Sequence, residues 1–340
     1  MIDRALSNKI SNMSVICAML VVMTHVFPKV EVRSFTWCVD RFIFDGLGRV
    51  AVPYFFIVSG FFLARHINES GWWWKALWNR VRTLLVPYVT WNLLWGLMPM
   101  FLAVFANLVG KRSLLANVAI PAWGWGMLRL PPLYPTWYIR TLLLFVVLSP
   151  IFITMLRTSA TMTLASSFIL YTGFYRSVAV PFGTWEAIPN TLINLEGLAF
   201  FLVGLKLAMD GKAREVPGKI ASTALMVSLI GTIVRMYCKA GGHVFLYNHI
   251  RFLVIPGFMW VLWKAVPPVP WPKWLTSSAF AIYLIHPFAI FWFRRFASAS
   301  IDGFIPYCAC AVTAILVPMT AKFAMQAISP RVTSFLFGGR

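Results

Sequence analysis

Long apolar segments alternate with short polar segments along the whole chain. A helix that crosses the hydrocarbon core of a bilayer needs about 20 apolar residues, and most of these segments approach that length. The pattern predicts an all-α fold, a polytopic membrane helical bundle of about ten transmembrane helices. Residues 1–340 would form a single membrane-embedded domain without internal repeats. The expected spans are approximately Ser11–Pro28, Leu47–Ala64, Leu84–Leu108, Thr136–Leu156, Thr161–Tyr175, Thr191–Ala208, Ile220–Tyr237, His249–Trp263, Leu275–Phe293 and Ile305–Ala324.

The composition supports this interpretation and narrows the range of partners. Hydrophobic residues make up 60% of the 340 residues, and the mean hydropathy is +0.76, whereas soluble domains are about 45–50% apolar. A formal charge of +20 would indicate nucleic-acid binding in a soluble protein. Because the sequence leaves no room for a soluble basic domain, we expect no nucleic-acid partner. Membrane lipids with anionic headgroups and anionic small substrates are the favoured partners instead.

An even number of spans places both termini on the same side of the membrane. Two dense basic clusters, Arg80 with Arg82 and the segment Lys206–Lys219, lie on that side, so the positive-inside rule favours cytoplasmic termini. Basic residues on the opposite side fit either an anionic acceptor or lipid phosphates. Cys38 and Cys238 are both expected on that opposite side, and the sequence leaves open whether they pair. We expect no metal site, because no spacing typical of metal ligands occurs, and phosphate-binding loops are likewise absent.

The first expected span carries one ionisable side chain, His25, near its far end. An imidazole in a bilayer is costly unless it is paired or faces a polar cavity, so it is a functional candidate. Ser14 lies eleven residues earlier, which places it on the same helix face about 16 Å away. The alternative is a structural histidine that bonds to a neighbouring helix.

Two later intramembrane residues are further candidates. His286 precedes Pro287, which kinks helices, so His286 has either a catalytic or a structural role. Arg140 is expected to point inward, where it either binds an anion or neutralises a carboxylate such as Glu196. An internal ion pair without a catalytic role is the alternative for Arg140 and Glu196.

Several segments, taken in order across nearly the whole chain, resemble the acyltransferase-3 family of membrane acyltransferases. His25 lies where that family has its first-span histidine. The other matching segments are VPYFFIVSGFFLA (Val52–Ala64), RVRTLLVPYVTWN (Arg80–Asn92), PTWYIRTLLLF (Pro135–Phe145) and SSAFAIYLIHPF (Ser277–Phe288).

The resemblance implies transfer of an acyl group, usually acetyl from cytoplasmic acetyl-CoA, to a hydroxyl of an extracytoplasmic glycan or lipid-linked sugar. It also implies a location in the bacterial inner membrane. Histidine suits the general base that a weakly nucleophilic hydroxyl needs, so His25 is the expected catalytic residue. A transient acyl carrier is the alternative role for His25, and the sequence does not decide between direct transfer and an acyl-enzyme. The phosphates of coenzyme A need a cationic mouth, and arginine binds phosphate well. The residues expected there are Arg80, Arg82, Arg65 and Lys75; ordinary inner-loop positive charge is the alternative explanation.

One position departs from the family pattern. Many members have an arginine eleven residues before the first-span histidine, and this chain has Ser14. Either another cation, such as Arg80 or Arg82, supplies the positive charge, or the site is altered. Two rival functions therefore stay open, a transporter or exporter of glycans or lipids and a non-catalytic relative of the family. Transporters also use charged groups and broken helices in the middle of the membrane.

Overall fold

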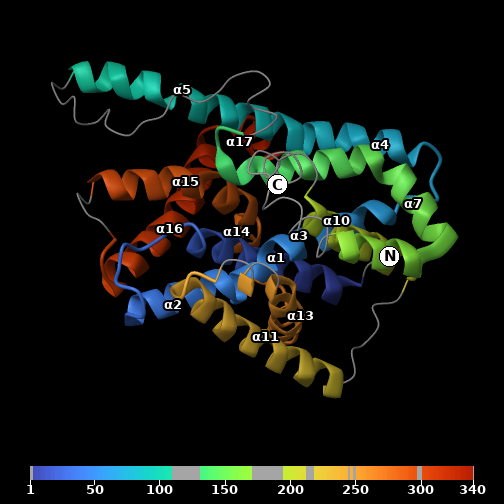
Figure 1. Ribbon diagram of the computed structural model, residues 1–340. Helices are drawn as coiled ribbons and strands as arrows, with labels where there is room; N and C mark the ends of the chain where they lie inside the picture. Colours follow the sequence, from blue (N-terminus) through green and yellow to red (C-terminus); the bar gives the residue numbers. More distant parts are fainter. Residues whose placement is uncertain are drawn as a thin grey trace.

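The computed structural model describes residues 3–108, 131–170, 194–211, 218–243, 246–247, 250–296 and 301–339. Within these ranges every regular element is a helix (Figure 1), which confirms the all-α prediction. The longer helices are α1 (Arg4–Met23), α2 (Phe35–Asp45), α3 (Ala51–Ala64), α4 (Trp72–Arg80), α5 (Val86–Leu108), α7 (Trp137–Ile169), α10 (Leu195–Met209), α11 (Gly218–Ala240), α13 (Ile255–Ala265), α15 (Ala279–Phe296) and α16 (Phe304–Ile328). Short elements are η1 (Leu47–Val50), η2 (Val81–Leu85), η4 (Tyr134–Thr136), η6 (Ile250–Val254), α14 (Lys273–Thr276) and α17 (Pro330–Phe337).

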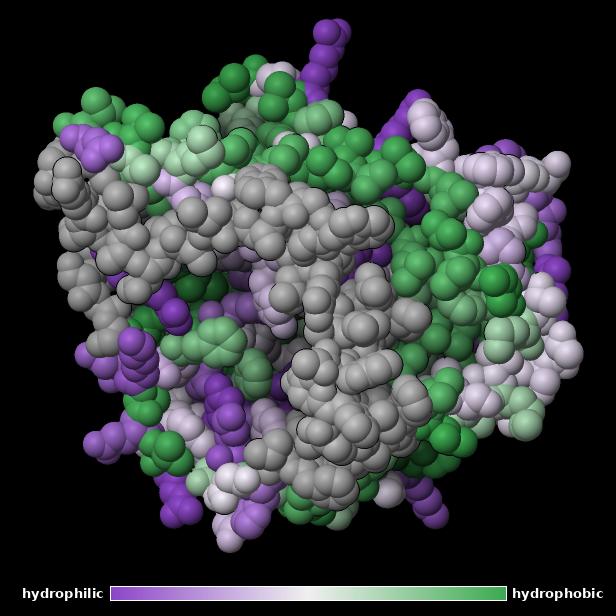
Figure 2. Space-filling view, turned by 45° about the horizontal axis from the view of Figure 1, so that its top comes forward, coloured by the Kyte–Doolittle hydropathy of each residue, from purple (hydrophilic) through white to green (hydrophobic). Residues whose placement is uncertain are grey.

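The helices form a bundle around α1, which contacts α2, α3, α14, α15 and α16. In Figure 1, α4, α5 and α7 lie on one side of α1, while α11 and α13 lie on the other. Six helical stretches of the described chain are long and apolar enough to cross a bilayer. Large hydrophobic side chains such as Phe101, Ile151, Ile233 and Ile305 are exposed on the outside. In Figure 2, green hydrophobic residues gather across the upper part and in a band to the right of the grey atoms. The chain is therefore a polytopic membrane bundle.

Three differences from the sequence prediction change the order or continuity of the helices. Residues 29–46 were expected to form a polar loop, but α2 begins at Phe35, where Ser34 Oγ accepts a hydrogen bond from the Trp37 amide. The third span begins earlier, because α4 and the π-helical turn η2 lead directly into α5. The fourth and fifth spans form one helix, α7, which is broken at Ser159 by non-helical dihedral angles (φ −154°, ψ 92°). Most of the expected loop at 109–135, up to residue 130, and the expected loop at 176–190 lie outside the described residues.

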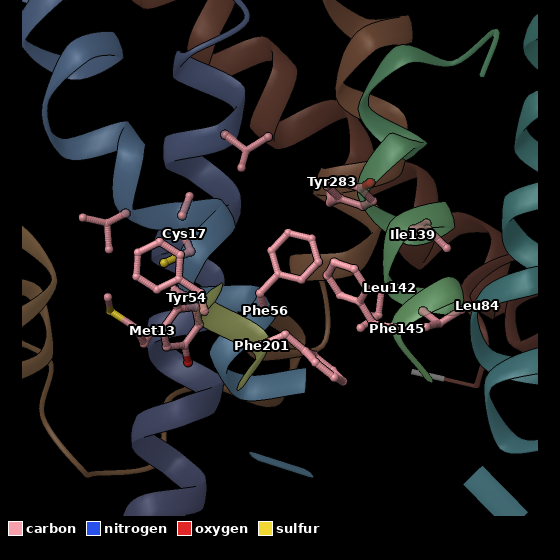
Figure 3. Packing of buried hydrophobic residues seen from close by; sticks show 14 of the residues in the cluster. Met13, Cys17, Tyr54, Phe56, Leu84, Ile139, Leu142, Phe145, Phe201 and Tyr283 are labelled. Atoms are coloured by element: carbon pink, nitrogen blue, oxygen red, sulfur yellow. The ribbon is translucent and has the colours of Figure 1, made fainter. Parts of the chain in front are cut away.

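Two glycines allow α3 and α10 to pack against each other at very short range. A Cβ atom at Gly204 would lie 2.0 Å from the Ile57 carbonyl oxygen, and one at Gly60 would lie 2.3 Å from the Phe201 carbonyl oxygen. Small residues permit this close approach in membrane bundles, where van der Waals packing drives helix association. Beside the crossing, Phe56, Phe145 and Phe201 are fully buried (Figure 3). This packing holds the framework on which the site residues lie.

Candidate active site

His25 lies in the turn that follows α1, with its side chain directed back along the helix. Its Nδ1 is 2.7 Å from the Val21 carbonyl oxygen. A carbonyl only accepts hydrogen bonds, so the neutral imidazole carries its proton on Nδ1 and leaves a lone pair on Nε2. Burial lowers the pKa of His25, and the bond to Val21 opposes this less strongly. The side chain is therefore held in the form that can act as a base.

His286 faces His25 from α15. The centroids of the two imidazole rings are 5.1 Å apart. The Nδ1 atom of His286 is 2.8 Å from the Tyr283 carbonyl oxygen and 3.1 Å from the Ile282 carbonyl oxygen. The Tyr283 carbonyl is available because its usual helical donor, the amide of residue 287, is missing in Pro287. His286 Nε2 is buried and has no hydrogen-bond partner among the described residues.

Both imidazoles line one cavity of about 530 Å³, which we call the His25 cavity. A volume of this size is typical of sites for small ligands. Other residues that line the His25 cavity come from α5, η4, α15 and the loop after α1, and include Phe27, Trp95, Tyr134, Pro135, Phe291, Arg294 and Arg295.

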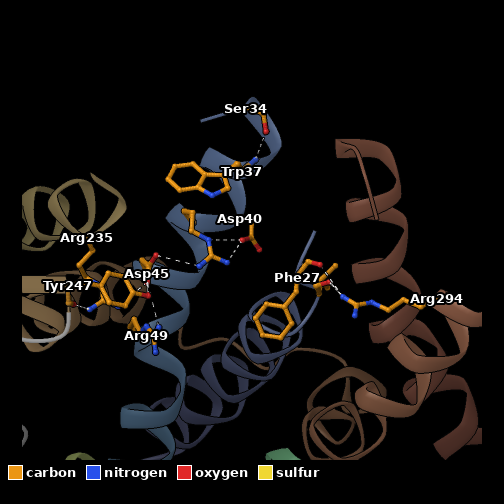
Figure 4. A network of polar contacts seen from close by, with 11 residues as sticks. Phe27, Ser34, Trp37, Asp40, Asp45, Arg49, Arg235, Tyr247 and Arg294 are labelled. Atoms are coloured by element: carbon orange, nitrogen blue, oxygen red, sulfur yellow. Dashed lines mark hydrogen bonds and ion pairs between the residues drawn. The ribbon is translucent and has the colours of Figure 1, made fainter. Parts of the chain in front are cut away.

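Arg294 ties the His25 turn to the helix that carries His286. Its Nη2 donates to the Val26 carbonyl at 2.5 Å and to the Phe27 carbonyl at 3.1 Å (Figure 4). Phe27 has a positive φ of 41°, a backbone conformation that is uncommon outside glycine. The two hydrogen bonds hold this turn and thereby fix His25 relative to His286. The sequence analysis missed this role, because Arg294 and His25 are far apart along the chain.

Ser14 does not share the cavity of His25, although the sequence analysis placed both residues on one face of the first span. It lines a second cavity of about 300 Å³, the Ser14 cavity, together with Arg80, Tyr138, Ser277 and Tyr283. The hydroxyl of Ser14 donates to the Ile10 carbonyl at 2.7 Å. The Ser14 cavity thus accompanies the N-terminal half of α1, and the His25 cavity lies at its C-terminal end.

Of the four cations expected to bind coenzyme A, only Arg80 lines either cavity. Arg82 is exposed and its guanidinium lies 5.1 Å from the centre of the Trp78 ring. Arg65 is exposed, and Lys75 Nζ lies 3.7 Å from a carboxylate oxygen of Glu69. Residues two positions apart on a helix point to nearly opposite sides, so Arg80 and Arg82 face different surroundings, a consequence of spacing that the sequence analysis did not apply to this pair.

A buried lysine that the sequence analysis missed lies beside the Ser14 cavity. Lys322 is 1% exposed, and its ammonium group donates to the carbonyl of Ser277, a residue that lines the cavity. Lys322 lies in the apolar run of α16, where a single cation could have been noted as an intramembrane charge. Lys322 is therefore a further cation that contacts the lining of the cavity in which Ser14 lies.

Arg140 and Glu196 are both buried but line neither cavity. Glu196 forms an ion pair with Arg251 at 2.6 Å.

A buried ionic cluster connects α2 with α11. Asp45 pairs with Arg235 at 2.9 Å and accepts a hydrogen bond from the Tyr247 hydroxyl at 2.6 Å (Figure 4). Arg49 lies 3.7 Å from the same carboxylate. The cluster neutralises Asp45, one of the acidic residues in the segment 29–46 that was expected to be a polar loop.

The remaining titratable candidates supply no metal site or disulfide in the described structure. Cys38 and Cys238 are free thiols. Within the described ranges, no group of three or more His, Cys, Asp or Glu side chains could hold a metal ion. His66 and His243 are exposed.

The fold and the paired histidines define a polytopic membrane protein with a base-containing cavity. The family model described as an acyltransferase domain matches residues 9–322, nearly the entire chain. The protein therefore belongs to the acyltransferase-3 family, as the motifs predicted. No curated protein matches the chain, and no solved structure matches it.

Proposed function

We propose that this membrane acyltransferase moves an acetyl group from cytoplasmic acetyl-CoA to a hydroxyl of an extracytoplasmic glycan or lipid-linked sugar in the bacterial inner membrane. The observation that carries the proposal is the His25–His286 pair in one cavity at the end of α1. The Ser14 cavity, with Arg80 in its lining, supports a separate donor site nearer the N-terminal end of α1. With both termini cytoplasmic, the donor would enter from the Ser14 side and the acceptor from the His25 side.

The donor site rests on charge and hydrogen-bonding geometry. Arg80 offers a guanidinium that binds phosphate with two parallel hydrogen bonds. Lys322 adds a second cation beside the cavity, held by the Ser277 carbonyl. Together they supply the positive charge that Ser14 does not.

Tyr283 lies between the two cavities. Its ring lines the Ser14 cavity, and its hydroxyl donates at 2.5 Å to the carbonyl of Pro135, a residue that lines the His25 cavity. Its own carbonyl holds His286 Nδ1. The acyl thioester passes from one cavity to the other by displacing this ring. The bond to Pro135 closes the route when no donor is present and so limits wasteful hydrolysis.

The chemistry follows from the lone pair on His25 Nε2. The acceptor hydroxyl transfers its proton to this nitrogen as its oxygen attacks the thioester carbonyl carbon, and a tetrahedral adduct forms. The carbon–sulfur bond then breaks, and the departing thiolate of coenzyme A takes the proton from the His25 imidazolium. The products are an O-acetyl ester and free coenzyme A. His286 Nε2 provides a second hydrogen-bond acceptor for the sugar and orients the reacting hydroxyl.

Purified protein in nanodiscs tests this proposal directly. We expect acetyl-CoA and a mixture of glycan acceptors to yield coenzyme A and acetylated glycan, detected by mass spectrometry. Comparing surface glycans of cells with and without the gene identifies the natural acceptor class. Transmembrane flux of a glycan without any acetylation would instead favour a transporter. Neither reaction nor flux would favour a non-catalytic relative.

A further inference from the structure

The His25 cavity carries positive charge. Arg294 and Arg295 both line it, and none of the described residues in its lining is acidic. The two histidines that share it act in their neutral forms in the proposed reaction. The two arginines therefore make the described lining basic, which favours an anionic ligand.

Arg294 can bind a ligand while it holds the His25 turn. Its two bonds to backbone carbonyls both use Nη2, and a guanidinium has five N–H donors. Nε and Nη1 are not used by these two bonds. The tethered nitrogen fixes the guanidinium beside the turn, so the group is positioned before a ligand arrives.

Aromatic rings provide a second kind of contact in the same cavity. Trp95, Tyr134 and Phe291 line it, and the Trp95 ring is held by edge-to-face contacts with Phe288 and Phe291, at 4.6 and 6.1 Å between centroids. The C–H face of a sugar ring packs well on such flat apolar surfaces, whereas its hydroxyls need polar partners. His25 and His286 supply such partners beside the rings.

We propose that the acceptor is an anionic saccharide. One sugar hydroxyl lies against the histidine pair, and a carboxylate or phosphate on the same or a neighbouring unit pairs with Arg295 and Arg294. Bidentate contacts between guanidinium and an anion fix both distance and orientation. They would select which hydroxyl reaches His25. This inference rests on the proposed function, because it assigns the second substrate of that reaction.

Pairs of acceptors that differ only in charge show whether the protein recognises the charge of the acceptor or its shape. We would compare a short oligosaccharide of hexuronic acids with its methyl ester, which has the same hydroxyls and no charge, in phosphatidylcholine nanodiscs. A disaccharide with and without a short-chain lipid phosphate forms a second pair. The first pair tests a carboxylate on the glycan, and the second tests the phosphate of a lipid linkage. Acceptor binding without acetyl-CoA is measured alongside acetyl transfer.

We expect the charged member of at least one pair to have a KM at least tenfold lower than its neutral partner. Arg295→Gln should remove most of this difference and leave the KM of the neutral partner nearly unchanged. Arg294→Gln should in addition lower kcat for both partners, because it also releases the His25 turn. Arg331→Gln is the matched control, since Arg331 is an exposed arginine on α17 that lines neither cavity.

Three outcomes would overturn the inference. The charged and neutral partners could have equal KM values, or Arg295→Gln could weaken both equally. Phosphatidylglycerol in the nanodiscs could also abolish the preference by competition, which would assign the arginines to lipid headgroups. If neutral acceptors are acetylated as well as charged acceptors, the inference of an anionic acceptor is refuted and the proposed function still stands. Selective binding of the charged partner without acetyl transfer would refute the proposed function and leave the anionic-ligand site standing.

Discussion

Replacing His25 by alanine removes the Nε2 lone pair on which the proposed reaction depends. General-base catalysis typically contributes about 10²–10⁴-fold to rate, which corresponds to about 2.7–5.4 kcal/mol of transition-state stabilisation. The turn around residue 25 should persist in the variant, because Arg294 holds the Val26 and Phe27 carbonyls independently of the imidazole. We therefore expect His25→Ala to lower kcat at least 100-fold while the protein stays folded.

The assay is acetyl transfer by protein in nanodiscs, with both substrates saturating so that binding does not limit the rate. Acetyl-CoA binding is measured separately. It should be nearly unchanged, since the Ser14 cavity contains neither histidine. Thermal unfolding serves as the control for folding.

The pH dependence of kcat follows from the same residue. Burial lowers the pKa of His25, and the reaction needs the neutral imidazole. Activity should therefore be full above this lowered pKa and decline as the pH falls through it, at values below the usual pKa of about 6.5. This acid limb should be absent from the residual activity of His25→Ala.

His25→Asn distinguishes catalysis from packing. Asparagine keeps a hydrogen-bonding side chain but has no basic atom, so the variant should be as inactive as His25→Ala. An asparagine variant with near-normal turnover would refute the assignment of His25 as the base, and His286 would become the next candidate.

Three further substitutions test other parts of the structure. Arg80→Gln should raise the KM for acetyl-CoA at least tenfold, because a hydrogen bond to a charged group contributes about 1.5–3 kcal/mol. Arg82→Gln is its matched control and should change this KM little, since Arg82 stacks on exposed Trp78; equal effects of both would place the donor elsewhere. Tyr283→Phe removes the bond to the Pro135 carbonyl and should raise release of coenzyme A in the absence of acceptor, measured with a thiol reagent; an unchanged rate would contradict a closing role. Gly204→Ala places a Cβ 2.0 Å from a backbone oxygen of α3. It should destabilise the bundle by about 1–3 kcal/mol, which is measured as a lower Tm. Gly218→Ala is the control, because its Cβ meets open space and the Tm should not fall.

The sequence by itself determined the class of protein, because bilayer crossing depends on local runs of apolar residues. The ends of α3, α10, α11 and α16 were all predicted to within four residues, whereas α1 begins seven residues and ends five residues earlier than expected. The family assignment was equally accessible, since its short motifs occur in a fixed order and need no contacts to be recognised. The error at α2 has a local cause: Asp40 and Asp45 made the segment appear solvated.

Tertiary structure decided which candidates share a cavity. Ser14 lies in α1 and His25 lies in the turn that follows it, yet the two residues line different cavities, and His286, which faces His25, is 261 positions further along the chain. Arg80 and Arg82 point to different sides because they are two positions apart on a helix, but only the packing of the helices showed that Arg80 is the one that lines a cavity. The roles of Arg294 and Lys322 depend on carbonyls from distant segments. Hydropathy and spacing describe one helix at a time, whereas these contacts arise only when separate helices pack together.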